Sequence, residues 1–390
     1  TNAVILPIAL EGPDRVKHNV PRLRRTPFKL TVGKPFRLAP VEGRGRSQQL
    51  EQRTDVIMAH IAVIQQSAHC VLSAIVDPSP SAAAVAAAQG VPLYISLDEL
   101  LAQDKPDGII LATPNALHVT QALQCMAAGV PLLLEKPIAT TVQEAQDLVE
   151  HVEAMGAPVL IGHHRAHSAI MAQAKQVVDS GRLGTLVAVM GSAMFFKPDS
   201  YFSDAPWRRE MGAGPILINM IHEVHNLRML CGDIVAVQAF KSHTTRGFAV
   251  EDTVAINLRF ASGALGSFML SDTAASARSW EQTSQENKAY VSYDDEDCYV
   301  ISGTFGSLSV PTMRLKTYAQ PQDRSWFNPF QCSTVALQRE DPLALQMAHF
   351  LDMIQHDVTL RVSARDGLQN LLVVEAIVQA AQTQQTVRLS

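Results

Sequence analysis

The chain has 390 residues, 47% hydrophobic and 18% charged, which is ordinary for a globular protein long enough for two domains. A net charge of −5 argues against nucleic acid or an anionic membrane as partner, and no apolar run approaches the roughly 20 residues of a membrane span. The odd set of five cysteines without a CxxC pair indicates reduced thiols, and without a secretory signal pattern we expect a cytoplasmic protein.

Residues 1–57 form an atypical first segment, rich in Arg, Lys and Pro and with little periodicity. In residues 58–165, short apolar runs that predict buried strands alternate with helix-like stretches. The strand-like runs are CVLSAIVD (70–77), LYI (93–95), GIILAT (108–113), PLLLEK (131–136) and PVLIGH (158–163). The helix-like stretches are 81–90, SLDELLAQ with Ser96 as expected N-cap, 118–129 and 142–156. This alternation predicts an α/β fold with a parallel, doubly wound sheet.

The rhythm changes in residues 166–390, where strand-like runs stand beside a few helices. Helices are expected at 168–181 and 216–232, and a final amphipathic one at 364–383. The strand-like runs are TLVAVMGSAMFF, VAVQAFKSHT, DTVAINLRFASGALGSFMLSD and YVISGTFGSLSVP, with ASG (261–263) as a hairpin turn. The pattern predicts an α+β second domain with a mostly antiparallel sheet.

Polar residues close the strands of the first domain. Asp77 ends one strand, where a carboxylate can hold both ribose hydroxyls of an adenosine and repel a 2′-phosphate, or simply cap a turn. Thr113, Pro114 and Asn115 end the next long strand, with His118 one helical turn further on. We expect this turn to face a nicotinamide riboside, although a plain turn with an N-cap has the same pattern.

Glu135, Lys136 and Pro137 end the apolar run LLLEKP, where three such residues do not suit the middle of a buried strand. An ammonium there can orient a substrate hydroxyl and favour its oxyanion as hydride leaves. Pro137 favours a cis bond that would fix the direction of Lys136. The alternative is a surface lysine before a loop.

Two histidines, His222 and His225, share one face of the expected helix 216–232. A neutral imidazole is a natural proton acceptor for an alcohol that is being oxidised. The spacing also suits two zinc ligands, but no third ligand stands at a diagnostic distance, so we expect no metal. A packed or capping role is the other reading, above all for His225.

A polar and aromatic loop, KPDSYFSDAPWRR, separates a strand from this helix. Loops with such side chains often line a pocket of sugar size, although the tryptophan also suits simple packing. Its candidate substrate residues are Lys197, Tyr201, Trp207 and Arg208.

The motif order TPN, EKP, GHHR and APWRR, followed by GAGPILINMIHEVHNLRML, resembles the glucose–fructose oxidoreductase / inositol dehydrogenase / MocA (Gfo/Idh/MocA) superfamily from about Cys70 to the C-terminus. The resemblance implies a Rossmann domain, an α+β domain with an open sheet that often builds dimers or tetramers, and NAD or NADP as cofactor, with Asp77 favouring NAD. It implies a sugar, a cyclic polyol or a related hydroxy compound as substrate.

The resemblance also assigns roles. Lys136 matches the family's motif lysine and His222 its catalytic histidine, while Arg165, Asn219 and His225 join the expected substrate wall. Many members carry aspartates four residues before and three after that histidine, where this chain has Ile218, beside Asn219, and His225. We therefore expect a different proton relay rather than inactivation.

The front of the chain departs from the family pattern. Counting back from His60, which matches a histidine after the family's GxGxxG, the glycine positions fall on Gln52, Thr54 and Ile57. The local candidate is Gly43 and Gly45, whose third glycine is missing. Three explanations stand: a rebuilt loop on these two glycines, loss of tight dinucleotide binding, or a wrong reading frame over residues 1–57, which we favour and which sequencing of the transcript would test.

We thus expect an NAD(P)-dependent dehydrogenase acting on CH–OH groups, in which His222 takes the alcohol proton and Lys136 supports the oxygen. A non-catalytic ligand sensor on the same fold is the alternative, and the departing glycine loop favours it. Stoichiometric zinc in the purified protein would be needed for a metalloenzyme.

Overall fold

A computed structural model describes residues 8–11, 29–32 and 46–389, with side chains from residue 56 onward. The chain divides into two compact units: Thr1–His164 with Leu343–Leu371, and Arg165–Pro342 with Leu372–Ser390. A stretch near the C-terminus therefore belongs to the first unit.

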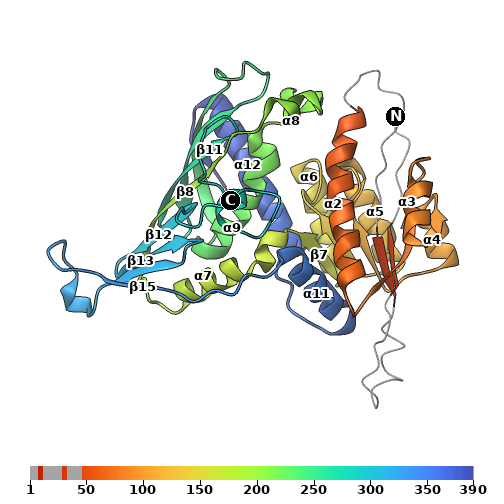
Figure 1. The fold of residues 1–390 in the computed structure, drawn as a ribbon, viewed down its shortest axis with the longest axis horizontal. Coiled ribbons are helices and arrows are strands. Elements are labelled where there is room, and N and C mark those ends of the chain that lie inside the picture. Colours follow the sequence, from red (N-terminus) through yellow and green to blue (C-terminus); the bar gives the residue numbers. More distant parts are fainter. Residues whose placement is uncertain (1–7, 12–28, 33–45, 390) are drawn as a thin grey trace, which may run out of the picture. The chain divides into compact units, whose positions relative to one another are not determined.

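The first unit contains a seven-stranded sheet of order β4–β3–β1–β2–β5–β6–β7, with helices around it (Figure 1). Its strands are β1 (Ile8–Glu11), β2 (Lys29–Val32), β3 (Val71–Val76), β4 (Leu93–Tyr94), β5 (Gly108–Leu111), β6 (Leu132–Glu135) and β7 (Val159–Gly162). Its helices are α2 (Arg46–Gln66), α3 (Ala82–Gln89), α4 (Leu97–Gln103), α5 (Asn115–Ala127), α6 (Val142–Met155), α11 (Pro342–Gln355) and the start of α12 (Ala364–Thr383). The 3₁₀ turn η2 (His164–His167) crosses the boundary into the second unit.

The parallel, doubly wound sheet predicted from the sequence is confirmed. Strand β2 runs parallel to both β3 and β5, and β5, β6 and β7 continue the parallel pairing, whereas β1 is antiparallel. Every residue of β5, β6 and β7 is buried, as expected for strands covered on both faces. The carboxyl ends of the parallel strands consequently share one edge of the sheet.

Local signals delimit the helices of this unit, and the N-cap expected at Ser96 is confirmed. Ser96 caps α4 by accepting the Glu99 amide hydrogen, and Thr141 with Glu144 forms a capping box at the start of α6. Gly90 ends α3 with φ of 66°, a left-handed conformation that a glycine adopts at little cost. These signals keep the connections to the strands short.

Helix α2 runs unbroken through positions 52, 54 and 57, where the family pattern would place glycines. From residue 57, its side chains Ile57, Ile61 and Ile64 are buried in a core with Leu133 and Phe350. At these positions the chain thus forms a continuous helix instead of the glycine turn of the family pattern. Gly43 and Gly45, the candidate replacement, lie outside the described residues.

The second unit is built on a nine-stranded sheet of order β15–β14–β13–β12–β8–β11–β10–β9–β16. Its strands are β8 (Leu186–Met194), β9 (Ile234–Ser242), β10 (Thr253–Phe260), β11 (Leu265–Ser271), β12 (Tyr299–Gly303), β13 (Gly306–Val310), β14 (Arg314–Thr317), β15 (Gln331–Thr334) and β16 (Val387–Arg388). Its helical segments are α7 (Ala169–Asp179), α8 (Asp199–Ser203), η3 (Pro206–Arg209), η4 (Ile216–Met220), α9 (Ile221–Cys231), α10 (Trp280–Thr283), η5 (Pro321–Asp323) and the rest of α12.

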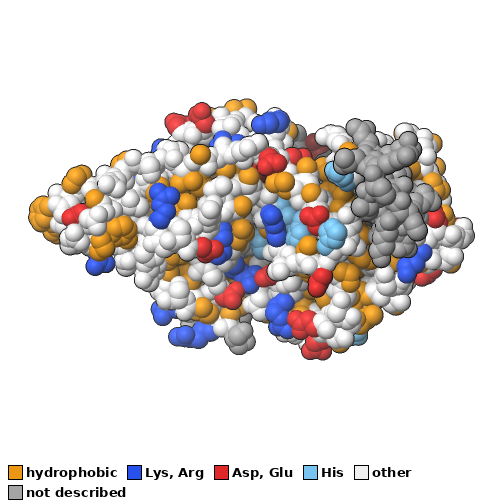
Figure 2. Space-filling view, turned by 90° about the horizontal axis from the view of Figure 1, so that it is seen from below, with side chains coloured by type: hydrophobic (Ala, Val, Ile, Leu, Met, Phe, Trp, Pro, Cys, Tyr) orange, Lys and Arg blue, Asp and Glu red, His pale blue; other side chains and the backbone are white. Residues whose placement is uncertain are grey.

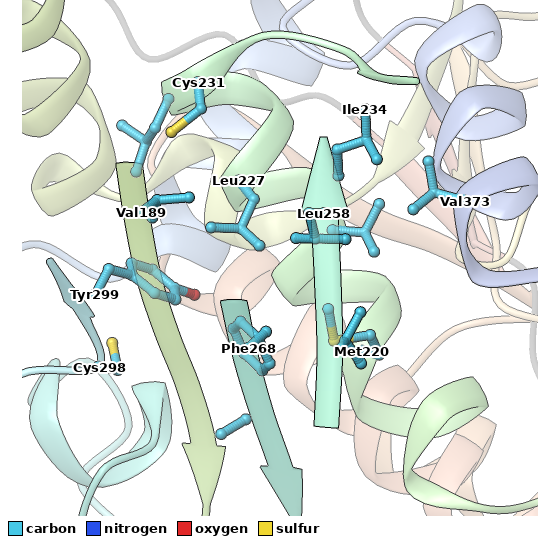
Figure 3. Close-up of a cluster of buried hydrophobic side chains, with 14 of the residues drawn as sticks. Val189, Met220, Leu227, Cys231, Ile234, Leu258, Phe268, Cys298, Tyr299 and Val373 are labelled. Atoms are coloured by element: carbon cyan, nitrogen blue, oxygen red, sulfur yellow. The ribbon is translucent and has the colours of Figure 1, made fainter. Parts of the chain in front are cut away.

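This second sheet is mostly antiparallel, as predicted, with one parallel pair between β8 and β11. The hairpin expected at 261–263 joins β10 to β11. Side chains of α7, α9 and α12 pack with the strands in one hydrophobic core, and Figure 3 shows Leu227 of α9 lying between Val189 and Leu258 of the sheet. One face of the sheet thereby anchors α9.

The other face of the nine-stranded sheet is open. Along β10, buried and exposed residues alternate, and Val187, Met190, Phe240 and Leu265 are among the exposed apolar side chains. Hydrophobic side chains also gather on the surface around the β14–β15 connection (Figure 2). Trp326, in that connection, is 90% exposed.

None of the helices in the described part of the chain combines the length and the apolar character that crossing a bilayer requires.

Candidate active site

Asp77 follows β3 at the edge where the parallel strands end, and it is fully buried. Its Oδ1 atom accepts a hydrogen bond from the Ser79 amide at 2.7 Å, and its own amide donates to the Tyr94 carbonyl oxygen at 2.9 Å. One carboxylate oxygen thus shapes the turn at this strand end. The turn-capping contact considered from sequence is present, and the ribose-binding role stays a prediction.

The TPN turn connects β5 to α5. Thr113 is buried, and its Oγ1 atom has no hydrogen-bond partner among the described residues. His118, one turn into α5, lies with Nδ1 2.7 Å from the Pro137 carbonyl oxygen and Nε2 2.9 Å from the Thr113 carbonyl oxygen. A neutral imidazole donates from one nitrogen only, so donation to both oxygens needs the protonated ring. His118 thereby joins the TPN turn to the EKP turn.

Glu135, the last residue of β6, is bonded to a histidine that the sequence places on α2. Its Oε1 atom lies 2.8 Å from His60 Nε2, and both side chains are buried. Burial alone would raise the pKa of Glu135, but the hydrogen bond from His60 and the charges of His60, Lys136 and His164 hold it below its usual value. The carboxylate at this strand end is therefore ionised.

Glycine at position 162, at the end of β7, gives this carboxylate its room. A Cβ atom on Gly162 would lie 2.8 Å from Cδ of Glu135, closer than side-chain atoms approach. Lys136 follows Glu135, donates its backbone amide to Glu135 Oε2 at 3.3 Å, and is joined to Pro137 by the predicted cis bond. Lys136 thus stands at the same strand-end edge as Asp77 and Thr113.

In the second unit, the expected helix 216–232 is a π-helical turn, η4, followed by α9. Single π-turns are rare in proteins, and those that occur are often found at functional sites. His222 and His225 lie near the start of α9, 8% and 5% exposed. Asn219 lies in the π-turn, three residues before His222 in the chain.

The residues of the KPDSYFSDAPWRR loop come together beside Asn219. Lys197 Nζ donates to Asn219 Oδ1 at 2.8 Å and lies 4.8 Å from the centre of the Tyr201 ring. The Arg208 guanidinium stacks on the same ring at 3.7 Å, donates to the Tyr201 carbonyl oxygen at 2.6 Å, and lies 5.7 Å from the Trp207 ring centre. Burial lowers the pKa of Lys197 to about 8 against the opposing charges of Asp272 and Glu281.

Arg165, predicted to line the substrate wall, has both terminal nitrogens engaged by carboxylates. Nη1 donates to Glu223 Oε1 at 2.6 Å and Nη2 to Glu281 Oε1 at 2.5 Å. The Tyr299 hydroxyl donates to Glu223 Oε2 and accepts from Asn226 Nδ2 at 3.0 Å. Burial raises the pKa of Glu223, although Arg165 opposes that rise. This buried network ties α9, directly beside His222, to β12.

The first unit fits a dinucleotide. A carboxylate at the end of β3, an orphaned buried hydroxyl at the end of β5 and an ammonium at the end of β6 all stand at the carboxyl edge of parallel strands, where open α/β sheets bind nucleotides. Among the described residues, we propose that those holding the cofactor are Asp77, Thr113, Pro114, Asn115, His118, Glu135, Lys136 and Pro137. Among the described residues, no group of three or more His, Cys, Asp or Glu could hold a metal ion.

Sequence reasoning named His60 only as a family position, and it missed Glu223, Tyr299, Glu281 and Asp272 as parts of the site. Glu223, the acidic residue in IHEVH, could have indicated a buried ion pair, because a carboxylate on a buried helix needs a partner. Tyr299 carried no such signal, since its contact comes from a strand more than 70 residues away.

Two family models match the chain. The model described as the oxidoreductase family with an NAD-binding Rossmann fold matches residues 56–163, and that of the GFO/IDH/MocA C-terminal domain matches residues 171–309. Residues before 56, which include the atypical start of the chain, lie outside the first match.

Among curated proteins, 1,5-anhydro-D-fructose reductase of Ensifer adhaerens is 25% identical over 342 residues, covering 84% of this chain and 94% of the relative. Among solved structures, WlbA dehydrogenase of Bordetella pertussis in complex with NADH and UDP-GlcNAcA has a TM-score of 0.66 at 24% identity, covering 86% of this chain and 96% of that one. An oxidoreductase from Agrobacterium radiobacter in complex with NAD+, L-tartaric acid and magnesium has a TM-score of 0.70 at 20% identity, covering 85% and 95%.

The two family matches fall on the two compact units, in the same order along the chain as the sequence motifs. This chain therefore belongs to the GFO/IDH/MocA family of oxidoreductases, with an NAD(P)-binding Rossmann domain.

Proposed function

We propose that this protein is an NAD-dependent dehydrogenase that oxidises a secondary alcohol of a sugar, a cyclic polyol or a related compound. The observation that carries the proposal is the polar edge of the first sheet, where Asp77, Thr113 and Lys136 follow three parallel strands. The curated relative supports it, since 1,5-anhydro-D-fructose is a sugar derivative. Asp77 supports NAD over NADP, because a carboxylate repels a 2′-phosphate.

The chemistry that the nicotinamide supplies when bound is acceptance of a hydride. In the proposed mechanism, an imidazole nitrogen of His222 takes the hydroxyl proton of the substrate. The ammonium of Lys136 donates a hydrogen bond to the same oxygen and stabilises the negative charge that develops on it. The ionised Glu135 carboxylate next to Lys136 favours the charged state of that ammonium.

The remaining candidates form the substrate wall. We propose that Lys197, Tyr201, Trp207, Arg208 and Asn219 contact the substrate, since the structure brings them into one cluster. Arg165 instead holds Glu223 and Glu281, so we assign it to positioning α9 rather than to substrate contact. His225, one turn after His222, stays a candidate for the wall.

A substrate panel tests the proposal: sugars and cyclic polyols are screened with NAD and with NADP for formation of reduced nicotinamide. Turnover of at least one panel member that is lost in His222→Asn supports a dehydrogenase. Nicotinamide binding without turnover of any panel member contradicts it.

The second candidate function is a non-catalytic ligand sensor on the same fold. The observation that favours it is α2, which is continuous where a glycine turn would approach the pyrophosphate. Titration with NADH, followed by nicotinamide fluorescence, and the substrate panel separate the two candidates. Binding without turnover across the panel favours the sensor, and no binding at all indicates a broken nucleotide site. A homodimer or homotetramer, with the open sheet as contact surface, is our proposal for the assembly.

A further inference from the structure

Lys197 carries a buried ammonium whose hydrogen-bonding capacity is largely unused. Its side chain is 9% exposed, and among the described residues its Nζ atom makes one hydrogen bond, to the neutral oxygen of Asn219. The ring of Phe195 lies 5.4 Å away and that of Tyr201 4.8 Å away. Because an ammonium has three N–H donors, two remain for a ligand.

The carboxylates that face Lys197 are already held by arginines. Asp272 Oδ2 is 3.9 Å from Lys197 Nζ, too far for a hydrogen bond, while Asp272 Oδ1 accepts from Arg246 Nε at 2.9 Å. Glu281 accepts from Arg165 at 2.5 Å. Among the described residues, then, no carboxylate lies within hydrogen-bond distance of this ammonium.

The surroundings also leave the charge of Lys197 under-compensated. Asp272 and Glu281 favour the ammonium, whereas Arg208 and Arg246 oppose it, and burial prevails and lowers its pKa to about 8. A buried charge is normally both paired and hydrogen-bonded in a folded protein. Lys197 has an ion pair with Asp272 at 3.9 Å but no hydrogen bond to it. A hydroxyl group would accept a hydrogen bond from Lys197 but add no opposite charge, whereas a carboxylate supplies both.

The position of the ammonium suits a ligand that also reaches the proposed proton acceptor. Lys197 is bonded to Asn219, which lies in the π-turn that leads into α9, three residues before His222 in the chain. The Arg208 guanidinium stacks on the Tyr201 ring, which Lys197 also contacts, and adds a second cation to the same cluster.

We propose that Lys197 determines specificity by binding a carboxylate of the substrate, so that the substrate class is a polyhydroxy acid, such as a sugar acid, rather than a neutral sugar. This inference rests on the proposed function, because it names the substrate of that site.

The test compares matched pairs that differ only in a carboxylate: D-glucuronate with D-glucose, and D-galacturonate with D-galactose. The kcat/KM ratio of acid to neutral sugar is measured for wild type, Lys197→Met and Lys197→Arg. We expect the wild-type ratio to be about 10- to 100-fold in favour of the acid, the size of one charge-assisted hydrogen-bonded contact. The ratio should fall to about 1 in Lys197→Met and stay within about threefold of wild type in Lys197→Arg.

A matched control is Lys175→Met, because Lys175 is exposed on α7 and bonded to Asp179 away from the cluster. Its ratio should equal that of wild type. Wild-type preference for the neutral sugar, or an acid preference that survives in Lys197→Met, overturns the inference.

Binding measurements separate this inference from the proposed reaction. If no pair is turned over, calorimetry with D-glucuronate and D-glucose, with and without NADH, decides the substrate class, while the wider substrate panel decides the dehydrogenase proposal. Acid binding that is lost in Lys197→Met supports the carboxylate site. Equal binding of acid and sugar, or no acid binding, overturns it. Melting temperatures of all variants, which we expect within a few degrees of wild type, exclude unfolding as the cause.

Discussion

His60 Nε2 lies 2.8 Å from Glu135 Oε1, and this buried pair joins helix α2 to the residue before Lys136. His60→Leu should therefore destabilise the fold by about 2–4 kcal/mol, because it leaves a buried carboxylate without its hydrogen-bond donor. Urea unfolding measures the loss, and exposed His151→Leu is the matched control. A free energy of unfolding equal to wild type would show that the pair contributes nothing.

The same pair has a pH dependence. The pKa of Glu135 is lowered in the folded protein, so its contribution to stability is present above the ordinary glutamate pKa and is lost as the pH falls through the folded value. The difference in unfolding free energy between wild type and Glu135→Gln should shrink as the pH falls below about 4.

Lys136→Met and His222→Asn test the proposed catalytic groups. Each should lower kcat/KM by about 10²- to 10⁴-fold, the range for loss of a general base or of a donor to a developing oxyanion. Initial rates of nicotinamide reduction give the effect, and circular dichroism confirms that both variants are folded. The exposed residues Lys175 and His151 provide matched controls, as Lys175→Met and His151→Asn. Rates within threefold of wild type would refute the assignment.

Asp77→Ser tests the cofactor preference. Removing the carboxylate at the end of β3 removes the proposed repulsion of a 2′-phosphate and the proposed ribose contact, so the expected preference for NADH over NADPH should fall at least tenfold. Fluorescence titration with both cofactors gives the ratio. The control is Asp98→Ser, because Asp98 is an exposed residue of α4. An unchanged ratio would limit Asp77 to its contact with Ser79.

Arg165→Met tests the network beneath α9. The change leaves Glu223 and Glu281 without their guanidinium, which should cost about 3–5 kcal/mol of unfolding free energy at pH 8. Because burial already raises the pKa of Glu223, protonation at acid pH should recover part of that loss. Tyr299→Phe removes one neutral hydroxyl, which donates to Glu223 and accepts from Asn226, and should cost about 1–2 kcal/mol. Equal losses in both variants would contradict the charged character of this network.

Lys197→Met tests the cost of burying the ammonium. A lowered folded pKa means that the unfolded chain binds more protons between about pH 8 and the ordinary lysine value near 10.4. The wild-type stability should therefore rise relative to Lys197→Met across that range, by up to about 3 kcal/mol. Chemical unfolding at pH 7.5 and 10 measures the change. A difference that is independent of pH would show that the ammonium is not under-compensated.

Much of the fold was predictable because its signals are local. Apolar runs closed by Asp77, Thr113 and Lys136 identified buried parallel strands, and the ASG segment (261–263) between two strand-like runs identified a hairpin. Helix α11 (Pro342–Gln355) was missed, and the π-turn before α9 could not be predicted, because no periodicity separates it from an ordinary helix. The expected domain limits, 58–165 and 166–390, stay predictions.

The site was predictable residue by residue but not in its pairings. The sequence proposed Lys197, Tyr201 and Arg208 from composition alone, and the structure brings them together. It could not show that Arg165 is held by Glu223 and Glu281, since these contacts join segments 58 and 116 residues apart. The structure does not test the explanations for residues 1–57, because Gly43 and Gly45 lie outside the described residues. Sequencing the transcript across residues 1–57 tests the reading-frame explanation.

The most direct test of the account is formation of reduced nicotinamide by wild type and His222→Asn on a panel of sugars, sugar acids and cyclic polyols with NAD. The account predicts turnover of at least one member by wild type and a loss of about 10²-fold or more in the variant, with NADH binding retained. NADH binding without turnover of any member, or turnover that persists in His222→Asn, would contradict it.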